Sequence, residues 1–349
     1  MIIQVGPYPP PYGGISVYIR RMKDFLDFKG IENYVWAMST TKKIENNVIK
    51  MRLRFVPFCY LIKRGVKLIH YNICGTKSKN YIGFFNRFLF QKNKVLTIHG
   101  SCADLFYIDG KIIKYLNSFD AIICVKKHDK KYLLKQGIHY NIYEIPAFIP
   151  PTSDETEINQ LPEFFHKIRH KHEFLITANA FRISFYKNQD LYGIDLSIEL
   201  MKRLFDNGYK DIGFIYVIPD IGDYDYFGKM QNLVKKYNFE DNFHFHTKPI
   251  AYPAVINMCD LFIRPTNTDG YAVSVSEAIL LKKPAIASDI CERPEGTILF
   301  KNRNVDDLYN KVIYVIENYT ESKKQIESIE FEDNAEKILE VYKKVLNGK

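Results

Sequence analysis

The 349-residue sequence contains no run of eighteen apolar residues and no charged leader followed by an apolar stretch. We therefore expect neither a transmembrane helix nor a signal peptide, because each needs such a run. The six cysteines form no Cys-x-x-Cys pair, and several lie in apolar, strand-like runs. This pattern favours a reduced cytosolic protein without a structural zinc site.

Acidic residues are scarce in the first part of the chain. Residues 1–150 carry 24 Lys/Arg and 9 Asp/Glu, a balance of +15, whereas the remainder carries 25 and 31, a balance of −6. Residues 51–100 hold ten Lys/Arg and no Asp or Glu, interleaved with Phe55, Phe58, Tyr60, Phe84, Phe85, Phe88 and Phe90. Such a region suits an anionic membrane surface or a diphosphate-linked lipid. Solvated lysines around core aromatics explain part of it, and no recognised motif supports nucleic acid as the partner.

The length and the 46% hydrophobic composition suffice for two α/β domains. Apolar, β-rich runs alternate with helical patterns at 2–5, 34–38, 67–73, 94–99, 121–125 and 143–148, and again at 174–180, 212–218, 243–246, 261–266 and 284–288. This alternation predicts doubly wound parallel sheets.

Two prolines and an acidic stretch at 153–160 place the domain boundary near 150–165. We therefore expect an N-terminal Rossmann-like domain over 1–155 and a C-terminal one over 165–330. The last helix, 334–349, has one apolar face and is expected to pack back on the first domain.

The most informative segment runs from Arg264 to Ser288 and sets two carboxylates, Asp269 and Glu277, on either side of a glycine-containing turn. Its pattern is strand, loop, helix, strand, so the loop leads into the amino end of a helix. Backbone N–H groups at such an end attract a diphosphate. The expected backbone cradle consists of Gly270, Tyr271, Ala272 and Val273. The alternative is an ordinary helix start, with Asp269 as a cap and Glu277 on a solvated face.

A second loop follows the first strand, where GPYPPPYGG (6–14) precedes a helix that we expect to stop near Gly30. Gly13 and Gly14 lack Cβ atoms, so a phosphate can approach their backbone closely. Alone, a proline-rich turn with two glycines is weak evidence for a binding site.

Two cations, Arg182 and Lys187, follow the strand at 174–180. Fixed cations stabilise the negative charge that develops on a departing nucleoside diphosphate. Two surface cations at a helix start are the alternative. His99 ends the strand at 94–99, at the sheet edge where open α/β sheets place ligands. A structural histidine with satisfied hydrogen bonds is nearly as good an interpretation.

Three features together resemble the retaining nucleotide-diphosphate-sugar glycosyltransferases of family 4, also called glycosyl transferases group 1. They are the Asp269–Glu277 spacing, which matches the family's E-x7-E signature, the string PPPYGGISVYI, and the R-x4-K spacing of Arg182 and Lys187. The first acid departs from the family pattern, because Asp269 is one methylene shorter than the usual Glu. The resemblance implies the GT-B fold, with two Rossmann-like domains facing a cleft.

The resemblance also implies residue roles. Arg182 and Lys187 would contact the donor diphosphate, Asp269 the sugar, Glu277 the ribose, and His99 would face the donor sugar. Gly13 and Gly14 would complete the diphosphate cradle. The implied catalytic residues are thus Asp269, Arg182, Lys187 and His99. No cofactor or metal is implied, and we find no Asp-x-Asp pair suited to hold a divalent ion against a diphosphate.

The reaction implied is transfer of a sugar, with retention, from a nucleoside-diphosphate sugar to a hydroxyl of a saccharide acceptor. The basic first domain favours a lipid-diphosphate-linked acceptor, as in O-antigen or capsule synthesis, and a peripheral position on the inner face of the plasma membrane. A sugar-nucleotide epimerase and a non-catalytic protein that binds sugar nucleotide or membrane remain alternatives.

Overall fold

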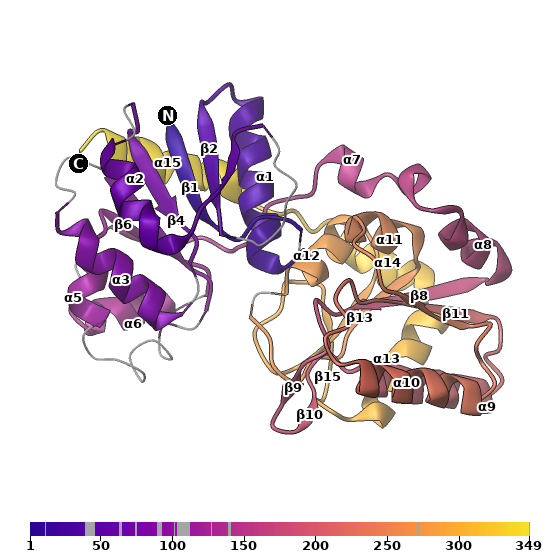
Figure 1. The fold of residues 1–349 in the computed structure, drawn as a ribbon. Helices are drawn as coiled ribbons and strands as arrows, with labels where there is room; N and C mark the ends of the chain where they lie inside the picture. Colours follow the sequence, from indigo (N-terminus) through magenta and orange to yellow (C-terminus); the bar gives the residue numbers. More distant parts are fainter. Residues whose placement is uncertain are drawn as a thin grey trace. The chain divides into compact units, whose positions relative to one another are not determined.

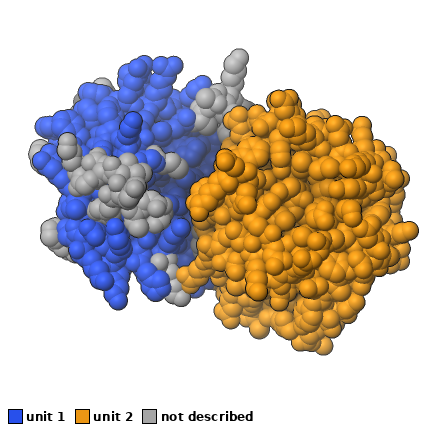
Figure 2. Space-filling model, turned by 90° about the horizontal axis from the view of Figure 1, so that it is seen from below, with its two compact units in different colours: residues 1–149, 332–349 blue, residues 150–331 orange. Residues whose placement is uncertain are grey.

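The computed structural model describes residues 1–10, 12–38, 46–62, 65–73, 75–88, 93–100, 102, 112–126, 128–138, 141–270 and 272–348. The chain forms two compact units, coloured separately in Figure 2. Unit 1 comprises residues 1–149 and 332–349, and unit 2 comprises residues 150–331. Each unit contains a parallel sheet with helices on its faces (Figure 1), which confirms the predicted doubly wound α/β fold.

The sheet of unit 1 is parallel throughout, with strand order β3-β2-β1-β4-β5-β6-β7. Its strands are β1 (Ile2–Gly6), β2 (Asn33–Ala37), β3 (Val48–Lys50), β4 (Leu68–Tyr71), β5 (Asn93–Ile98), β6 (Ala121–Cys124) and β7 (Ile142–Glu144). From β1 the chain first builds the sheet outward through β2 and β3, then returns to β4 on the other side. The strand order therefore reverses between β1 and β4, which is where such sheets bind ligands.

Helices cover both faces of this sheet. They are α1 (Gly14–Phe28), η1 (Leu53–Phe55), α2 (Val56–Ile62), α3 (Thr76–Asn86), α5 (Ile112–Leu116), α6 (Asp129–Lys135) and α15 (Asn334–Leu346). On one face, apolar side chains of α2, α3, α5 and α6 share a core with alternating sheet residues such as Ile3, Val5 and Ile69. The first helix starts at Gly14, and Gly30 takes a positive φ of 68° just after it, as a helix stop requires.

The C-terminal helix α15 belongs to unit 1, although 182 residues of unit 2 precede its segment in the chain. Tyr342, on α15, is fully buried, and its hydroxyl lies 2.5 Å from Nδ1 of His70 on β4. The Asn334 side chain donates to the carbonyl oxygen of Phe148 at 2.8 Å, and Lys29 pairs with Glu336 at 2.9 Å. These contacts fasten the end of the chain to the first sheet (Figure 1).

The main sheet of unit 2 is also parallel throughout, with order β12-β11-β8-β13-β14-β15. Its strands are β8 (Phe174–Asn179), β11 (Ile212–Val217), β12 (Phe243–His246), β13 (Leu261–Arg264), β14 (Ala285–Ser288) and β15 (Ile298–Phe300). The order reverses between β8 and β13. A separate antiparallel hairpin, β9 (Phe185–Tyr186) and β10 (Gln189–Asp190), interrupts the path from β8 to the next helix.

The helices of unit 2 are α7 (Ser153–Thr156), η2 (Ile158–Gln160), α8 (Glu163–Lys171), α9 (Ile194–Asp206), α10 (Tyr224–Lys236), α11 (Tyr252–Met258), α12 (Val273–Leu280), α13 (Val305–Glu317) and α14 (Tyr319–Glu327). Apolar faces of α9, α10 and α13 pack on one side of the sheet, and those of α8, α11, α12 and α14 contribute to two clusters on the other. None of the helices in the described ranges is both long and apolar enough to cross a bilayer.

Candidate functional site

The carboxyl edge of the unit 2 sheet gathers the charged residues of the candidate site. Arg182 follows β8, Asp220 follows β11, Asp269 follows β13 and Arg293 follows β14. Because parallel strands end at the same edge, these loops meet there, around the reversal of strand order between β8 and β13.

Asp269 lies at the centre of a buried ion cluster that we call the Asp269 cluster: Arg264, Asp269 and Arg293. Arg264 Nε donates to Asp269 Oδ2 at 2.9 Å, and Arg293 Nη1 donates to the same oxygen at 3.0 Å. The Thr266 hydroxyl donates to Oδ2 at 3.2 Å and the Gly270 N–H to Oδ1 at 2.9 Å. The Asp269 carboxylate is therefore held from several directions by groups of its own unit.

The electrostatics of the Asp269 cluster keep Asp269 and Arg264 ionised. Burial would by itself raise the pKa of Asp269, but the charges and hydrogen bonds of Arg264 and Arg293 outweigh it and hold the pKa well below its usual range. Burial disfavours the charged form of Arg264 too, and the Asp269 carboxylate reverses this, so the pKa of Arg264 is raised. Two cations and one anion leave the cluster with a net positive charge at neutral pH.

The Asp269 cluster also joins the ends of three strands. Arg264 Nη1 donates to the Asn179 carbonyl oxygen at 3.0 Å and to its side-chain oxygen at 3.2 Å, at the end of β8. Arg293 Nε donates to the Ser288 carbonyl oxygen at 3.1 Å, at the end of β14. The cluster therefore fixes the loop that follows β13. Asp269 orders this loop, and its direct contact with the sugar stays a prediction.

Neither arginine was identified from the sequence. A signal for Arg264 was present, because an arginine ends the otherwise apolar strand Leu261–Arg264 only five residues before Asp269. Arg293 lies 24 residues beyond Asp269 and gave no comparable signal. Its side chain is almost completely buried, at 1% exposed.

Helix α12 starts at the end of this loop without a side-chain cap and with no acidic residue in its first turn. Ala272 is the N-cap and has a φ of +20°, so the unusual backbone conformation occurs there and not at Gly270. The interpretation of Asp269 as the helix cap is therefore wrong. Glu277 is buried, which also excludes a solvated face for it. Tyr271, part of the predicted backbone cradle, lies outside the described residues.

Arg182 projects from the loop after β8 and is 53% exposed. Its Nη1 lies 3.6 Å from Asp220 Oδ2, and the backbones of the two residues form an isolated parallel bridge. Gly222 allows this approach, because a Cβ there would lie 2.3 Å from Arg182 Nε. Arg182 is therefore a cation positioned at the sheet edge and still open to solvent.

Lys187 lies in a β-hairpin and not at the start of a helix. It occupies the tip of the β9–β10 hairpin, where Lys187 and Asn188 have φ values of 50° and 59°, so it does not begin a helix. Its Nζ lies 5.4 Å from the centroid of the Tyr186 ring. The Asn267 side chain donates to the Tyr186 carbonyl oxygen at 3.3 Å, which connects the hairpin to the loop of the Asp269 cluster.

In unit 1, Gly13 and Gly14 form the amino end of α1. The Ser16 hydroxyl accepts from the Gly13 N–H at 2.8 Å and lies 2.9 Å from the Gly13 carbonyl oxygen, to which it donates. A Cβ at Gly14 would meet nothing within 4 Å. The fold therefore does not require glycine at this position.

His99 follows β5 at the carboxyl edge of the unit 1 sheet. Its Nε2 lies 2.9 Å from Asn72 Oδ1, and its ring packs edge-on against Tyr18 at 5.0 Å between centroids. Burial, followed by the charge of Lys79, lowers the pKa of His99 to about 3. His99 is therefore a neutral hydrogen-bonding group at physiological pH.

Three buried polar side chains near His99, those of Thr97, His70 and Tyr342, are connected by hydrogen bonds. His70 Nε2 is 2.7 Å from the Thr97 hydroxyl, while Nδ1 contacts Tyr342. Burial, with a smaller effect of His99, lowers the pKa of His70 to about 3 as well. The edge of unit 1 is thus polar but uncharged at its histidines.

Two further patterns in unit 2 bear on metal binding. The sequence Asp223-Tyr224-Asp225 lies at the start of α10, where Asp223 caps the helix by accepting from the Tyr226 N–H at 2.9 Å. His244 and His246 on β12 contact the rings of Phe164 and Phe165. Within the described ranges, no three His, Cys, Asp or Glu residues lie close enough to hold a metal ion.

Comparison with known proteins finds a family match that covers most of the second unit. Residues 163–330 match the family model described as glycosyl transferases group 1. Protein CapJ of Staphylococcus aureus is 30% identical over 175 residues, which cover 45% of this chain and 43% of that protein. The chain thus spans less than half the length of this curated relative.

Solved structures resemble the whole chain. A glycosyltransferase from Rickettsia africae has a TM-score of 0.75 at 16% identity, with 100% of this chain and 99% of that chain covered. Anabaena HepE, solved in complex with UDP-glucose, has a TM-score of 0.68 at 15% identity, with 99% and 98% covered. At these identities the likeness shows the fold, which is that of the GT-B glycosyltransferases.

Proposed function

We propose that this chain, whose residues 163–330 match the family model of glycosyl transferases group 1, is a retaining glycosyltransferase that uses a nucleoside-diphosphate sugar. The acceptor would be a hydroxyl group of a saccharide. The observation that carries the proposal is the arrangement at the carboxyl edge of unit 2, where the net-positive Asp269 cluster adjoins the uncapped amino end of α12.

This edge offers a diphosphate two kinds of stabilisation. Backbone N–H groups at the start of α12 are not capped by a side chain, and the helix dipole is positive there. Arg182 adds an exposed guanidinium, which can donate to two phosphate oxygens at once. We assign Arg182 and Lys187 to the donor diphosphate and Glu277 to the ribose.

In the proposed reaction, the bond between the anomeric carbon and the diphosphate oxygen breaks as the acceptor oxygen bonds to the same face of that carbon. The acceptor proton passes to the departing diphosphate, so no protein side chain needs to act as a general base. Fixed cations and helix N–H groups stabilise the charge on the leaving group without a metal ion. We assign Asp269 to the sugar, which it would contact from the loop that it holds in place.

We assign acceptor recognition to unit 1, together with the roles of Gly13, Gly14 and His99 that the resemblance implies. A neutral His99 suits hydrogen bonding to sugar hydroxyls better than ion pairing. The basic balance of residues 1–150 favours a lipid-diphosphate-linked saccharide of a surface polysaccharide such as O-antigen or capsule. Such an acceptor would bring the protein to the inner face of the plasma membrane.

The first test is release of nucleoside diphosphate from a panel of UDP-, GDP-, ADP- and TDP-sugars, with and without a lipid-diphosphate saccharide extract. Release from one donor that rises with the extract is expected. Conversion of the donor without an acceptor would point to an epimerase. Absence of both reactions, together with thermal stabilisation by a nucleotide, would point to a binding protein.

The residue test is substitution of Arg182 and Lys187 by Ala. Loss of a cation that stabilises the leaving group lowers turnover by roughly a hundredfold or more. Lys202→Ala is a matched control for Lys187→Ala, because Lys202 Nζ also lies beside a tyrosine ring, 5.8 Å from the Tyr237 centroid. Lys202 lies near the carboxyl end of α9, away from the candidate site. Near-normal turnover of the Arg182 or Lys187 variant would refute that residue's assignment.

A further inference from the structure

Four phenylalanines of unit 1 expose much of their side chains on adjoining elements. Phe55 ends η1, Phe58 lies on α2, Phe84 lies on α3 and Phe88 follows α3 (Figure 1). Their exposed fractions are 45%, 50%, 45% and 61%. We call these four residues the aromatic patch. Exposed apolar side chains that cluster in this way mark binding surfaces.

The aromatic patch is built into the fold. Phe85, less exposed than its neighbours, has ring centroids 5.5 Å from Phe58 and 5.3 Å from Phe84, so it connects α2 to α3. The rings of Phe84 and Phe88 lie 5.7 Å apart. The Tyr81 hydroxyl donates to the Arg54 carbonyl oxygen at 2.9 Å and fastens η1 to α3. The exposed rings are therefore held in place before any partner binds.

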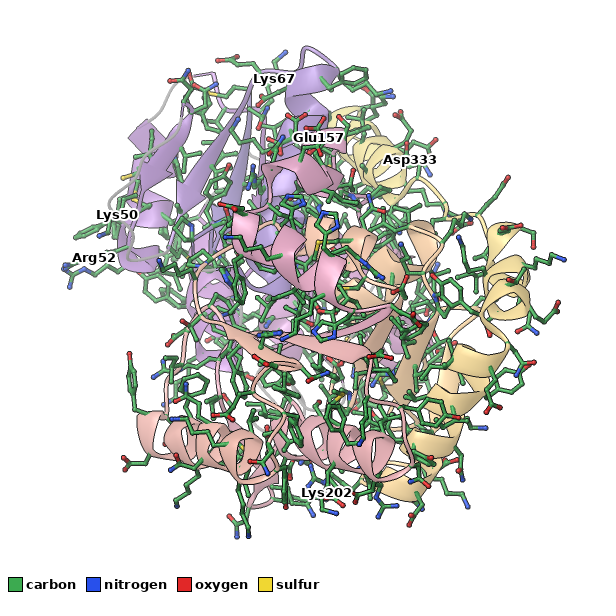
Figure 3. The ribbon with its side chains drawn as sticks, turned by 90° about the vertical axis from the view of Figure 1, so that its right-hand side faces the viewer. Lys50, Arg52, Lys67, Glu157, Lys202 and Asp333 are labelled. Carbon is green, nitrogen blue, oxygen red and sulfur yellow. The ribbon has the colours of Figure 1, made fainter. Side chains whose placement is uncertain are left out.

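Basic side chains border the aromatic patch. The Arg54 guanidinium lies 4.7 Å from the centroid of the Phe55 ring. Lys50 and Arg52 are exposed just before η1, and in Figure 3 both side chains point away from the ribbon. The sequence contains no Asp or Glu between residues 51 and 100.

Exposed rings beside exposed cations match the chemistry of one partner, the surface of an anionic bilayer. Aromatic rings enter the boundary between headgroups and acyl chains, where no complementary shape is needed, while Lys and Arg pair with the headgroup phosphates. A protein partner would need a matching apolar surface. A nucleic-acid duplex, whose bases are already stacked on one another, would leave much of the apolar area of Phe58, Phe84 and Phe88 without a partner. Charge and apolarity together favour the bilayer.

We propose that the aromatic patch, together with Lys50, Arg52 and Arg54, is a docking surface for an anionic lipid bilayer. Binding to vesicles requires no sugar donor and no acceptor. The inference therefore stands or falls separately from the proposed function, although it would supply the membrane position that a lipid-linked acceptor requires.

The test is co-sedimentation of the full chain with vesicles of phosphatidylcholine alone and of phosphatidylcholine mixed with phosphatidylglycerol, at low and at high salt. The wild-type protein should bind the mixed vesicles, and added salt should weaken this binding. Replacing both Arg52 and Arg54 by Glu should weaken binding by more than about thirtyfold, because the attraction of two basic residues is lost and the new carboxylates are repelled by the anionic surface. Replacing Phe58 and Phe84 by Ser should weaken it roughly tenfold through lost apolar contact.

Matched controls carry the same changes elsewhere. Phe28→Ser alters a phenylalanine of unit 1 that is 86% exposed at the end of α1, outside the aromatic patch. Lys229→Glu with Lys236→Glu reverses two exposed charges on α10 in unit 2. Neither control should change vesicle binding. Far-ultraviolet circular dichroism of each variant verifies that it folds.

Three outcomes would overturn the proposal. The wild-type chain could fail to bind the mixed vesicles. Patch variants and controls could bind equally well. The Phe58 and Phe84 substitutions could change the oligomeric state in sedimentation velocity while vesicle binding stays the same, which would assign the surface to a second copy of the chain.

Discussion

The two parallel sheets of this protein carry opposite kinds of polar chemistry at equivalent edges. The carboxyl edge of unit 2 is charged, with Arg264 and Arg293 converging on Asp269. The carboxyl edge of unit 1 carries neutral His99, paired with Asn72 and backed by neutral His70. The same topology thus gives both units a sheet edge of the kind where ligands bind, and the side chains at that edge decide which ligand chemistry each could serve.

The difference has a physical reason. A buried carboxylate can stay ionised only when fixed cations replace the water it loses, as Arg264 and Arg293 do for Asp269. A buried histidine without a carboxylate partner gives up its proton instead. We therefore expect the carboxyl edge of the unit 2 sheet to attract anions, and His99 at the edge of the unit 1 sheet to hydrogen-bond neutral groups.

The single tryptophan allows the unfolding of unit 1 to be measured separately. Trp36 lies on β2 and is buried in the core of unit 1. Its fluorescence therefore reports unfolding of unit 1, while far-ultraviolet circular dichroism reports both units.

The largest effect on stability is expected from Asp269→Asn. The substitution leaves Arg264 and Arg293 buried without a counter-charge, which should destabilise unit 2 by about 3 kcal/mol. In urea unfolding, part of the circular dichroism signal should shift to lower urea while the Trp36 transition stays in place.

Asp306→Asn is the control for that substitution, because Asp306 pairs with Arg203 on an exposed surface and should contribute little. If Asp269→Asn unfolds at the same urea concentration as the wild type, the ion cluster does not hold the loop together. If both signals shift equally, the two units unfold as one and the comparison has to be made by activity.

The next largest effect is expected in unit 1 from Tyr342→Phe. Removing the hydroxyl leaves Nδ1 of the buried His70 without its partner and should cost about 2 kcal/mol. The Trp36 transition should now shift. Tyr314→Phe, on the exposed surface of α13, should leave it unchanged. An unshifted Trp36 transition in Tyr342→Phe would mean that α15 does not stabilise unit 1 through this contact.

The stability of unit 1 should also depend on pH, through His70. The expected change in stability per pH unit is smaller than the effect of Tyr342→Phe. The folded state lowers the pKa of His70 to about 3, whereas an unfolded histidine titrates near 6.5. The unfolded state therefore binds more protons below pH 6.5, and stability is complete above that pH. It should fall by roughly 1.4 kcal/mol per pH unit for each such histidine as the pH drops towards 3.

Trp36 fluorescence in urea, measured from pH 7 to pH 4.5, tests this dependence. His70→Gln should lower the slope by the contribution of one histidine and leave that of His99, while His246→Gln in unit 2 should not alter it. A slope that is identical in the wild type and in His70→Gln would show that His70 is not the group responsible.

The smallest structural effect is expected from Gly14→Ala. A Cβ at this position meets nothing within 4 Å, so stability should change by only a few tenths of a kcal/mol. If a phosphate approaches the backbone there, turnover should nevertheless fall severalfold. Ser16→Ala is a useful companion, because it removes the hydroxyl that bonds to Gly13 while leaving Gly14 unchanged. Unaltered turnover in Gly14→Ala would exclude close contact between this glycine and a phosphate.

Much of the fold could be predicted because long apolar strands alternate with helical patterns. The strands β3 and β15 were not predicted from the sequence, because three residues are too few to show the alternation of apolar and polar side chains. The β9–β10 hairpin escaped as well, because Lys187 and Asn188 take positive φ values that their residue types do not announce. The spacing between Arg182 and Lys187 was therefore visible in the sequence, but its local structure was not.

The sequence by itself determined the alternation of strands and helices, the basic balance of the first 150 residues and the glycine-rich loops, because these depend on neighbours along the chain. Only the tertiary structure decided that Arg264 and Arg293 share Asp269, that Tyr342 meets His70 across 272 positions, and that four phenylalanines remain exposed around α2 and α3. Ion pairing, histidine protonation and exposure all depend on which distant side chains the packed sheets bring together, and local sequence does not encode that.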